Sequence, residues 1–527
     1  MHRPDTHASW WDDAVGYEIY VRSFADSNGD GIGDLPGIEA KLGHLASLGI
    51  DAIWLTPFYP SPQADFGYDV SDYTDVDSDY GTLEDFDRLV ASASDLGIRV
   101  VVDLVPNHTS SQHPWFQKAL EEGPGSEYWD RYIWRAPGPG GGLPNNWLSH
   151  FGGPAWTLEP TSGLYYLHLF HPRQPDLNWE NPEVHQEFRR ILRFWVDRGV
   201  SGLRIDVAHA MYKHPSFADN PRHPEAADTA AKVLTFRDFA HVHDLDQPDN
   251  VEVYRGWKIL VGPEVVLLGE VYLYPPHLVR RYVGDGAIDL SFYFGLNQLE
   301  WDPVEFVQRI RHAVETIPSG WAWVQGSHDE HRNVTRFGGG AEGVERSLAL
   351  WIALMGLPGL PFLYQGEELG LPNGIVHARH VLDPAAAVAP EFGRDPCRTP
   401  MPWTAHPGHG FTEADTAWLI AEPRPEEETV EHQLRDDGSP LNRMRALIQA
   451  RRDTAEERTG EVAWLESEDT VLAYRWDGVA HVANLGDASA TVDVGEGWEV
   501  AHSTNEVKLL GPDLTLPAHT GAILRRQ

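Results

Sequence analysis

Eight short runs of apolar and β-branched residues, separated by amphipathic helical segments, are the feature that most restricts how this chain can fold. This alternation is typical of βα units, whose strands form a parallel sheet. The predicted strands are Val15–Val21, Ala52–Pro57, Arg99–Pro106, Gly202–Val207, Val265–Tyr272, Ala287–Phe292, Trp321–Ser327 and Leu360–Tyr364. Eight strands with intervening helices predict an α/β fold, a (β/α)8 barrel of the TIM type.

The helical segments carry apolar residues at the spacing of one helix face. They are predicted at Ile38–Leu48, Leu83–Leu96, Val184–Arg198 and Pro303–Thr316. The first three end at a glycine (Gly49, Gly97 and Gly199), the residue that most often stops a helix.

Two stretches depart from this alternation and predict further domains. Residues 109–178 separate the third strand from the fourth and are rich in glycine, proline and aromatic residues, which predicts an inserted subdomain. From about Gly460 the pattern changes to short alternating runs, which predicts an all-β C-terminal domain. The runs are Val471–Trp476, Ala480–Leu485, Ala490–Val494, Leu514–Leu516 and Ala522–Leu524. The resulting division is 1–108 and 179–455 for the barrel, 109–178 for the insertion, and 456–527 for a C-terminal β-sandwich.

Charge and cysteine usage narrow the classes of partner. Against 41 Lys and Arg the chain has 79 Asp and Glu, a net charge of −38, which disfavours nucleic acid and anionic membranes as partners. It has one cysteine, Cys397, so no intramolecular disulfide can form. The first residues lack the apolar stretch of a secretory signal, and no apolar run approaches the roughly 18 residues of a membrane span. We therefore expect a cytoplasmic enzyme with a small neutral substrate.

Acidic side chains stand at the ends of three predicted strands. Asp206 closes the fourth strand, Glu270 lies near the end of the fifth, and Asp329 follows the seventh. Active sites of (β/α)8 barrels form at the carboxyl ends of the strands, so these acids are expected to converge on one rim, with His108 and His328 beside them. Paired carboxylates without a cluster of metal ligands suit glycoside cleavage, in which one acid protonates the leaving oxygen and the other attacks or activates water.

Several ordered segments carry a family resemblance. Asp103–His108, Gly202–Asp206, Glu270 and His328-Asp329 resemble the four core motifs of the α-amylase family of glycoside hydrolases (family 13), and Gly49–Pro57 resembles another of its barrel-strand motifs. Gln174–Trp179 resembles a fifth motif in the form of the oligo-1,6-glucosidase and α-glucosidase branch. The likeness extends from about residue 10 to the C-terminus.

The resemblance implies a role for each catalytic acid. Asp206 would be the nucleophile, Glu270 the general acid and then the general base, and Asp329 would bind sugar hydroxyls and stabilise the distorted ring. Arg204 lies two residues before Asp206, so both side chains face the same side of the strand and the guanidinium favours the ionised nucleophile. Net retention would place the carboxyl groups of Asp206 and Glu270 about 5–5.5 Å apart.

The resemblance also implies how the sugar is bound. Tyr68 would stack on the terminal glucose, and Asp65 would pair with Arg398 to close the far end of the site. Further candidate contacts are His108 and His328, for hydroxyl groups, and Phe151 and Phe170, as walls from the insertion. Two departures affect the pocket wall: Phe66 stands where the branch has asparagine, and Pro402 stands where glutamine is common.

These observations favour a retaining, exo-acting α-glucosidase that acts on short oligosaccharides. Val207, which follows the nucleophile, is typical of enzymes that cleave α-1,6 bonds, whereas Ala208-His209 resembles α-glucosidases that favour maltose. We expect α-1,4 cleavage with some α-1,6 activity. The alternatives are an oligo-1,6-glucosidase, a transglucosylase such as a trehalose synthase, and a sucrose-hydrolysing enzyme on the same scaffold.

A metal site is predicted after the first strand, away from the chemistry. Oxygen-bearing residues alternate there as Asp26, Asn28, Asp30, the Ile32 carbonyl and Asp34, a spacing that folds a loop around a hard cation. Gly37 replaces the glutamate of an EF-hand, so this is a different loop. The family branch has a structural Ca²⁺ or Mg²⁺ at this segment. No organic cofactor is expected.

Overall fold

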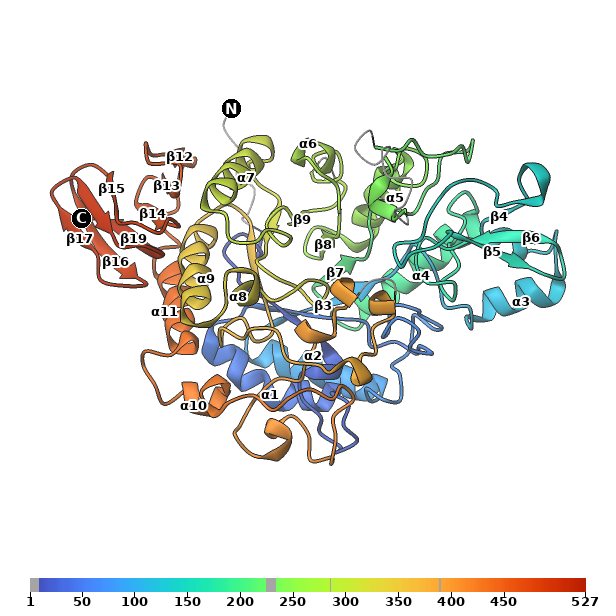
Figure 1. Ribbon diagram of the computed structural model, residues 1–527, viewed down its shortest axis with the longest axis horizontal. Helices are drawn as coiled ribbons and strands as arrows, with labels where there is room; N and C mark the ends of the chain where they lie inside the picture. Colours follow the sequence, from blue (N-terminus) through green and yellow to red (C-terminus); the bar gives the residue numbers. More distant parts are fainter. Residues whose placement is uncertain (1–8, 224–233, 285, 388–389) are drawn as a thin grey trace.

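A computed structural model describes residues 9–223, 234–284, 286–387 and 390–527 of the chain. Its centre is a closed barrel of eight parallel strands in the order β1-β11-β10-β9-β8-β7-β3-β2 (Figure 1). The strands are β1 (Gly16–Ile19), β2 (Ala52–Leu55), β3 (Arg99–Leu104), β7 (Gly202–Ile205), β8 (Val266–Gly269), β9 (Leu290–Tyr293), β10 (Trp321–Trp323) and β11 (Leu360–Tyr364).

The eight predicted strands are thus confirmed, and each lies in the barrel. β1 pairs with both β2 and β11, with Gly16 opposite Ala52 and Phe362, and this pairing closes the cylinder. Most observed strands end one to three residues earlier than the apolar runs. The residues past the last ladder pair turn into the βα-loops, and these are the positions that carry the acidic side chains.

Helices cover the outside of the barrel, and the four predicted ones are confirmed. Along the chain they are α1 (Leu35–Leu48), α2 (Leu83–Asp95), α4 (Pro182–Asp197), α5 (Asp249–Val261), α6 (Pro276–Val279), α7 (Pro303–Thr316), α8 (Asn333–Arg336) and α9 (Gly340–Met355). The described residues of 365–387 and 390–429 form turns and short 3-10 segments, and they are followed by α10 (Val430–Gln433) and α11 (Pro440–Asp453).

Local chemistry sets the helix ends. The Asp34 side chain accepts a hydrogen bond from Gly37 N and caps α1, and Thr82 forms a capping box with Asp85 at the start of α2. The predicted stop glycines adopt φ values in the left-handed region, including +97° at Gly49, which follows α1.

Large side chains fill the barrel interior. Trp54, Phe292 and Phe362 are almost completely buried there and touch one another. Gly16 provides the room, because a Cβ at this position would lie 2.5 Å from the Phe362 ring. The barrel is therefore a packed core, and the site must be built from the loops above it.

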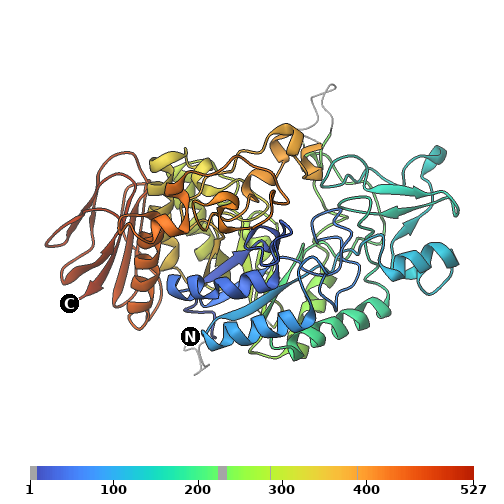
Figure 2. The same cartoon turned by 90° about the horizontal axis from the view of Figure 1, so that it is seen from below.

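The insertion between β3 and α4 contains α3 (Pro114–Glu122) and a small antiparallel sheet. The strands of the sheet are β4 (Trp134–Arg135), β5 (Trp156–Glu159) and β6 (Leu164–Leu167), in the order β4-β6-β5. This subdomain projects from the side of the barrel opposite the C-terminal strands, as both views show (Figures 1 and 2).

The C-terminal domain consists of two antiparallel sheets. One has the order β12-β13-β14-β19-β16 and the other β15-β18-β17. Their strands are β12 (Ala463–Trp464), β13 (Val471–Arg475), β14 (Val479–Asn484), β15 (Ala490–Asp493), β16 (Trp498–Ser503), β17 (Lys508–Leu510), β18 (Asp513–Leu516) and β19 (Thr520–Arg526). Val482 of the first sheet and Leu514 of the second belong to one buried cluster, so the sheets share a core.

The C-terminal domain packs against α9 of the barrel. The Tyr474 hydroxyl donates a hydrogen bond of 2.6 Å to the carbonyl of Ala353, and His481 Nδ1 lies 2.9 Å from the carbonyl of Ile352. Across the described ranges, no helix combines the length and the apolar character needed to cross a membrane.

Candidate active site

The three predicted catalytic acids follow three different strands of the barrel. Asp206 follows β7 directly, Glu270 follows β8 directly, and Asp329 lies in the loop after β10. Because β7 and β8 are parallel neighbours with Ile205 opposite Gly269, Asp206 and Glu270 leave the barrel side by side.

Arg204 is the centre of this group. Its Nη1 atom lies 2.8 Å from Asp206 Oδ1 and 3.1 Å from Asp103 Oδ1, and its Nη2 atom lies 2.9 Å from Glu270 Oε2. The guanidinium also lies over the Trp54 ring, 4.6 Å from its centroid. One buried cation therefore holds both predicted reacting carboxylates and a third carboxylate from β3.

The three acids differ in how far their side chains are exposed to solvent. The exposed fraction of the side chain is 8% for Asp206, 14% for Glu270 and 36% for Asp329, whereas Arg204 is 1% exposed. The guanidinium is therefore part of the support beneath the site, and the acids form its surface.

Crowding of like charges perturbs this group. Burial raises the pKa of Asp206 well above its ordinary value; Arg204 opposes the rise, and Glu270 and Asp103 add to it. Burial also raises the pKa of Asp103 to about 6, again opposed by Arg204. Three carboxylates around one guanidinium carry more negative charge than the cation balances, which favours uptake of a proton by the group.

The backbone directly after Asp206 adopts an unusual conformation. Val207 has φ +42°, in the left-handed region that β-branched residues rarely enter. In this conformation its N–H donates a 2.9 Å hydrogen bond to Glu270 Oε2. Such strain is concentrated at functional sites, and here it orients the side chain of Glu270.

Asp329 lies on the opposite side of the site, among cationic and imidazole groups. Burial would raise the pKa of Asp329, but His328, Arg394 and Arg398 outweigh this effect and hold the pKa far below its usual range. Arg398 Nη2 lies 2.8 Å and Arg394 Nη1 3.0 Å from Asp329 Oδ1. Asp329 is therefore ionised, in contrast to the crowded group around Arg204.

The two predicted histidines support the site. Burial lowers the pKa of His108 to about 4 and that of His328 to about 3, so both rings are neutral near pH 7. His328 Nδ1 lies 2.5 Å from Glu18 Oε1, and its ring stacks on Tyr68 with centroids 5.5 Å apart. The Tyr68 hydroxyl is 2.9 Å from His328 Nε2 and 3.1 Å from Asp103 Oδ2.

The sequence predicted that Asp65 pairs with Arg398, and this prediction was wrong. Arg394, four residues before the expected Arg398, places its Nη2 atom 3.0 Å from Asp65 Oδ1. Arg398 instead binds the carbonyl of His328 through Nε at 2.7 Å, in addition to Asp329. Arg398 thus contacts Asp329 and not Asp65.

Arg394 is held in place by its own loop. Its Nη2 atom lies 2.8 Å from Asp383 Oδ1, and its Nε donates a 2.9 Å hydrogen bond to Asp383 Oδ2. The guanidinium also lies over Phe151, 5.3 Å from the ring centroid. One arginine therefore joins Asp65, Asp329 and Asp383, which come from three different loops.

The aromatic candidates from the insertion lie beside these groups. Phe170 lies 5.2 Å from His108 and 6.1 Å from Phe151, measured between ring centroids. Gln174, the first residue of the Gln174–Trp179 motif, donates a 3.2 Å hydrogen bond to Asp65 Oδ2. The insertion thus reaches the acid that faces Arg394.

Reasoning from the sequence missed four polar groups of the site. They are Arg394, Asp383, Glu18 and Gln174. For Arg394 the sequence did contain a signal, because the Gly393-Arg394-Asp395 segment places a second arginine four residues before Arg398. Asp383 lies in a loop without regular structure, and its contact with Arg394 depends on the path of that loop.

The predicted metal loop is curled by its own side chains. Asp26 Oδ1 accepts hydrogen bonds from Asn28 N and Gly29 N, and Asn28 Oδ1 accepts one from Asp30 N. Asp30 Oδ1 accepts one from Ile32 N at 2.8 Å. These turns place oxygen-bearing side chains along one loop, and oxygen ligands suit Ca²⁺ or Mg²⁺.

Asp34 has other partners. Its Oδ2 accepts hydrogen bonds from the backbone and hydroxyl of Ser27, and its Oδ1 caps α1 through Gly37 N. Within the described residues, the carboxylates of Asp26, Asp30 and Asp34 do not each bring an oxygen within 4.8 Å of the others. A cation bound here would need these side chains to move closer together.

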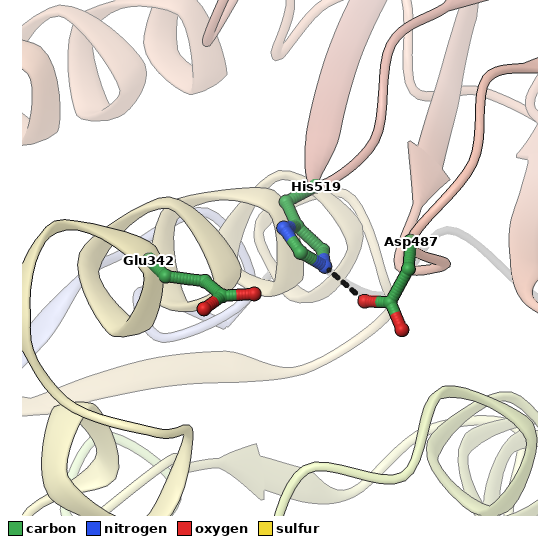
Figure 3. A group of neighbouring side chains, drawn as sticks. All are labelled: Glu342, Asp487 and His519. Atoms are coloured by element: carbon green, nitrogen blue, oxygen red, sulfur yellow. Dashed lines mark hydrogen bonds and ion pairs between the residues drawn. The ribbon is translucent and has the colours of Figure 1, made fainter.

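Three other side chains do bring their potential ligand atoms within 4.8 Å of one another. Glu342, Asp487 and His519 approach one another where α9 meets the C-terminal domain (Figure 3). Arg346 already lies 2.7 Å from Glu342 Oε1 and 3.2 Å from Asp487 Oδ1, and His519 Nε2 lies 2.8 Å from Asp487 Oδ1. The cation of this cluster is a guanidinium, so the group is an ion-pair contact between domains.

A family model described as the alpha amylase catalytic domain matches residues 18–460, which include the barrel, the insertion and all three acids. The chain belongs to the α-amylase family. The resemblance noted in the sequence is thereby confirmed. The match and the site geometry together identify a glycoside hydrolase that acts on a sugar substrate.

Relatives within the family agree with the predicted branch. The chain is 38% identical over 526 residues to a probable alpha-glucosidase from Rhizobium meliloti (strain 1021), with 95% of each chain covered. It is 36% identical to an oligo-1,6-glucosidase from Parageobacillus thermoglucosidasius, with 84% of each covered. The structure of an alpha-glucosyl transfer enzyme, XgtA, superposes with a TM-score of 0.92 at 36% identity, covering 99% of this chain and 100% of XgtA.

Proposed function

We propose that this glycoside hydrolase is an exo-acting, retaining α-glucosidase that releases terminal non-reducing glucose from short oligosaccharides. The observation that carries the proposal is the ion pair between Arg394 and Asp65, beside Asp329. Gln174 also donates a hydrogen bond to Asp65, and we infer that these bonded side chains close the end of the site beyond the catalytic acids. A glucan chain can then extend from the reacting sugar in one direction only, so the terminal unit alone fits.

Retention would proceed in two displacements. Asp206 attacks the anomeric carbon while Glu270 gives its proton to the leaving oxygen, which breaks the glycosidic bond and leaves a glucosyl ester on Asp206. Glu270 then takes a proton from water, the water oxygen attacks the same carbon, and Asp206 departs as a carboxylate. Both acids contact Arg204. This shared contact supports the proposal, because the mechanism requires two carboxyl groups close together.

The remaining groups bind the sugar. Asp329 is ionised and open to the site, so it can accept hydrogen bonds from hydroxyl groups and stabilise positive charge on the ring. Neutral His108 and His328 can donate or accept hydrogen bonds without adding charge. Tyr68, which stacks on His328, offers a ring for the face of the glucose.

The first test is the stereochemistry and identity of the products. Maltose, isomaltose, sucrose and soluble starch would be incubated with the enzyme, and the first product would be followed by proton NMR before mutarotation. We expect α-glucose from the non-reducing end, with maltose hydrolysed faster than isomaltose and starch attacked slowly. Initial release of β-glucose, or internal cleavage of starch, would contradict the proposal.

The roles of the two reacting acids are tested by substitution. We expect Glu270→Gln to reduce turnover of maltose by about 10³-fold or more while binding survives, because proton donation is lost. An aryl glucoside with an acidic leaving group should retain more activity in this variant. A 2-deoxy-2-fluoro glucosyl donor should label Asp206, as detected by peptide mass spectrometry. Wild-type rates of maltose hydrolysis in E270Q would contradict the assignment.

Transglucosylation is the second candidate, favoured by the close superposition on an enzyme named for glucosyl transfer. Such an enzyme would form the same ester on Asp206 and pass the glucosyl group to a sugar hydroxyl instead of water. Incubation with concentrated maltose separates the two outcomes. Glucose alone indicates hydrolysis, whereas trehalose or higher oligosaccharides indicate transfer.

We also propose that the Asp26–Asp34 loop holds one Ca²⁺ or Mg²⁺ ion. Asp26, Asn28, Asp30 and the Ile32 carbonyl would provide most ligands, and Asp34 would contribute after releasing Ser27. The ion would brace the loop against the 411–418 segment, where Asp26 N donates to the Phe411 carbonyl. Excess chelator should lower the melting temperature and added Ca²⁺ should restore it. The same treatment should have no effect on Asp30→Ala, and an unchanged wild-type melting temperature would contradict the proposal.

We also propose that the protein is located in the cytoplasm. The chain's single cysteine, Cys397, is buried, and a chain with one cysteine needs no oxidising compartment for an internal disulfide. Fractionation of the native cells with an antibody to the protein would test this assignment.

A further inference from the structure

Two cavities lie on the flank of the barrel, away from the catalytic acids. One, of about 340 Å³, opens between the start of the insertion's sheet, the residues before α4 and the loop after β7. The other, of about 240 Å³, lies between α4 and α5. Neither is lined by Asp206, Glu270 or Asp329. Tyr212 lines both cavities, so they are neighbours, and the two together are called here the flank groove.

Aromatic rings form part of the wall of the flank groove. Tyr212 is half-buried, and its hydroxyl lies 3.0 Å from His185 Nε2, which fixes the ring between the two cavities. Phe217 lines the larger cavity, but its ring is packed between other groups: the Arg135 guanidinium carbon lies 3.4 Å from its centroid and the Trp147 ring stacks on it at 5.4 Å. Tyr212 is therefore the aromatic ring offered to a ligand. Ring faces next to planar polar groups match a pyranose, which has an apolar C–H face and an equatorial belt of hydroxyl groups.

The arginines of the groove lack acidic partners. Arg135 Nη1 donates to the Trp134 carbonyl, and burial lowers the Arg135 pKa without an offsetting carboxylate. Within the described residues, neither Arg135 nor Arg189 has a carboxylate oxygen within 4.0 Å. Both guanidinium groups therefore keep donors for a ligand, and a fork of donors suits paired hydroxyl or carboxylate oxygens.

Acidic groups stand in the same groove, which decides the class of ligand. Glu180 lines the larger cavity and Asp249 lines the smaller one, each beside an arginine that it does not contact. An anionic ligand would be repelled by the acids and a cationic one by the arginines. A neutral ligand with many hydroxyl groups can donate to the carboxylates and accept from the guanidinium groups.

We propose that the flank groove is a second saccharide-binding site that holds a short gluco-oligosaccharide outside the catalytic centre. The ligand class rests on the proposed α-glucosidase function, because the substrate supplies the neutral polyhydroxyl compound. The combined volume of the two cavities is within the roughly 300–1,000 Å³ typical of small-molecule sites. Tyr212 lines both cavities, so its ring would lie between two sugar positions.

The test measures binding with the catalytic centre blocked. The wild-type enzyme would be saturated with 1-deoxynojirimycin and titrated with maltotriose by calorimetry and saturation-transfer NMR. We expect residual binding at millimolar concentration. Tyr212→Ala and Arg189→Gln should each weaken this binding at least fivefold, whereas kcat and KM for an aryl α-glucoside stay within twofold of wild type.

Arg190→Gln is the matched control. Arg190 is the next residue of the same exposed helix surface, but it pairs with Glu187 and does not line the groove. We expect R190Q to bind maltotriose as the wild type does. No binding to the blocked wild type would overturn the proposal, as would equal binding in R189Q, R190Q and the wild type.

The outcome is separable from the test of catalysis. Hydrolysis of the aryl glucoside and its inhibition by the iminosugar report on the proposed function alone. Binding of maltotriose to the blocked enzyme reports on the groove alone. Arg189 is exposed, so R189Q keeps the test valid if Tyr212→Ala lowers the melting temperature.

Discussion

At the scale of single residues, the active site divides into two electrostatic halves. Around Arg204, three carboxylates surround one cation, and burial raises the pKa of Asp103 and Asp206. Around Asp329, two guanidinium groups surround one acid and lower its pKa. One half is thus suited to hold and move a proton, and the other keeps a permanent negative charge near the sugar ring.

The first half predicts a pH effect of Asp103→Asn. Asp103 raises the pKa of Asp206, so removal of its charge should lower that pKa. The nucleophile must be ionised, so the acid limb of kcat/KM should move to lower pH even though the maximal rate falls. The measurement is kcat/KM for an aryl α-glucoside from pH 4 to pH 8.

Asp69→Asn controls for general damage to the site. Asp69 is a fully buried acid in the same region with a raised pKa, but it is not among the groups that shift the pKa of Asp206 most. Its acid limb should match that of the wild type. A limb that stays in place or moves upward in D103N would show that Asp103 does not influence the nucleophile.

The second half predicts the importance of Arg394. We expect Arg394→Gln to reduce kcat/KM for maltose by about 10²-fold or more, because charge-assisted bonds to Asp65 and Asp329 are lost. Most of the loss should be in KM, since the proposed function places the pair at the end of the sugar far from the breaking bond. Arg379→Gln, an exposed arginine on the same loop, should behave as the wild type. Equal kinetics in both variants would refute the closing role of Arg394.

At the scale of elements, the site depends on how the insertion is fastened to the barrel. Lys213, in the loop after β7, is buried with its Nζ 2.9 Å from Asp176 Oδ2 and 3.0 Å from Asn107 Oδ1. Asp176 Oδ1 accepts a hydrogen bond from Leu169 N of the insertion. One ammonium thus joins the end of β3, the loop after β7 and the returning strand of the insertion.

Removal of this cation should destabilise the protein. We expect Lys213→Met to lower the free energy of unfolding by about 3–5 kcal/mol, because the Asp176 carboxylate stays buried without a partner. The double variant Lys213→Met/Asp176→Asn should recover much of this loss, since it removes the uncompensated charge. Denaturant unfolding of the two variants and the wild type measures both effects. A double variant less stable than K213M would contradict this explanation.

At the scale of the whole molecule, surface charge is the dominant feature. The chain carries −38 net charges, from 79 acidic and 41 basic residues. Mutual repulsion of this size disfavours the compact state, and it is screened within about 10 Å at 0.1 M salt.

This charge predicts stabilisation by salt. We expect the melting temperature to rise between about 0.01 M and 0.5 M KCl, where the Debye length falls from about 30 Å to only a few ångströms. Differential scanning fluorimetry at fixed pH measures the shift. An equal concentration of sucrose is a control for effects of added solute on hydration. A melting temperature that falls steadily with KCl would show that specific ion pairs, and not net repulsion, control stability.

The sequence alone determined the barrel and the identity of the acids. Hydrophobic periodicity and helix-stop residues are local signals, so all eight barrel strands and the helices α1, α2, α4 and α7 could be read from them. In the C-terminal domain the apolar runs predicted β13, β14, β15, β18 and β19 but not β12, β16 and β17. Those three have mostly exposed or half-exposed residues, which leave little hydrophobic pattern.

Only the tertiary structure decided which side chains meet. Arg394 and Arg398 are both cations near the same loop, and nothing in their spacing says which one reaches Asp65. The flank groove likewise joins residues 132–135, 178–180 and 211–217, which are far apart in the chain. Contacts of this kind depend on the paths of long loops, and those paths are set by packing over the whole molecule, beyond the reach of any local pattern of residues.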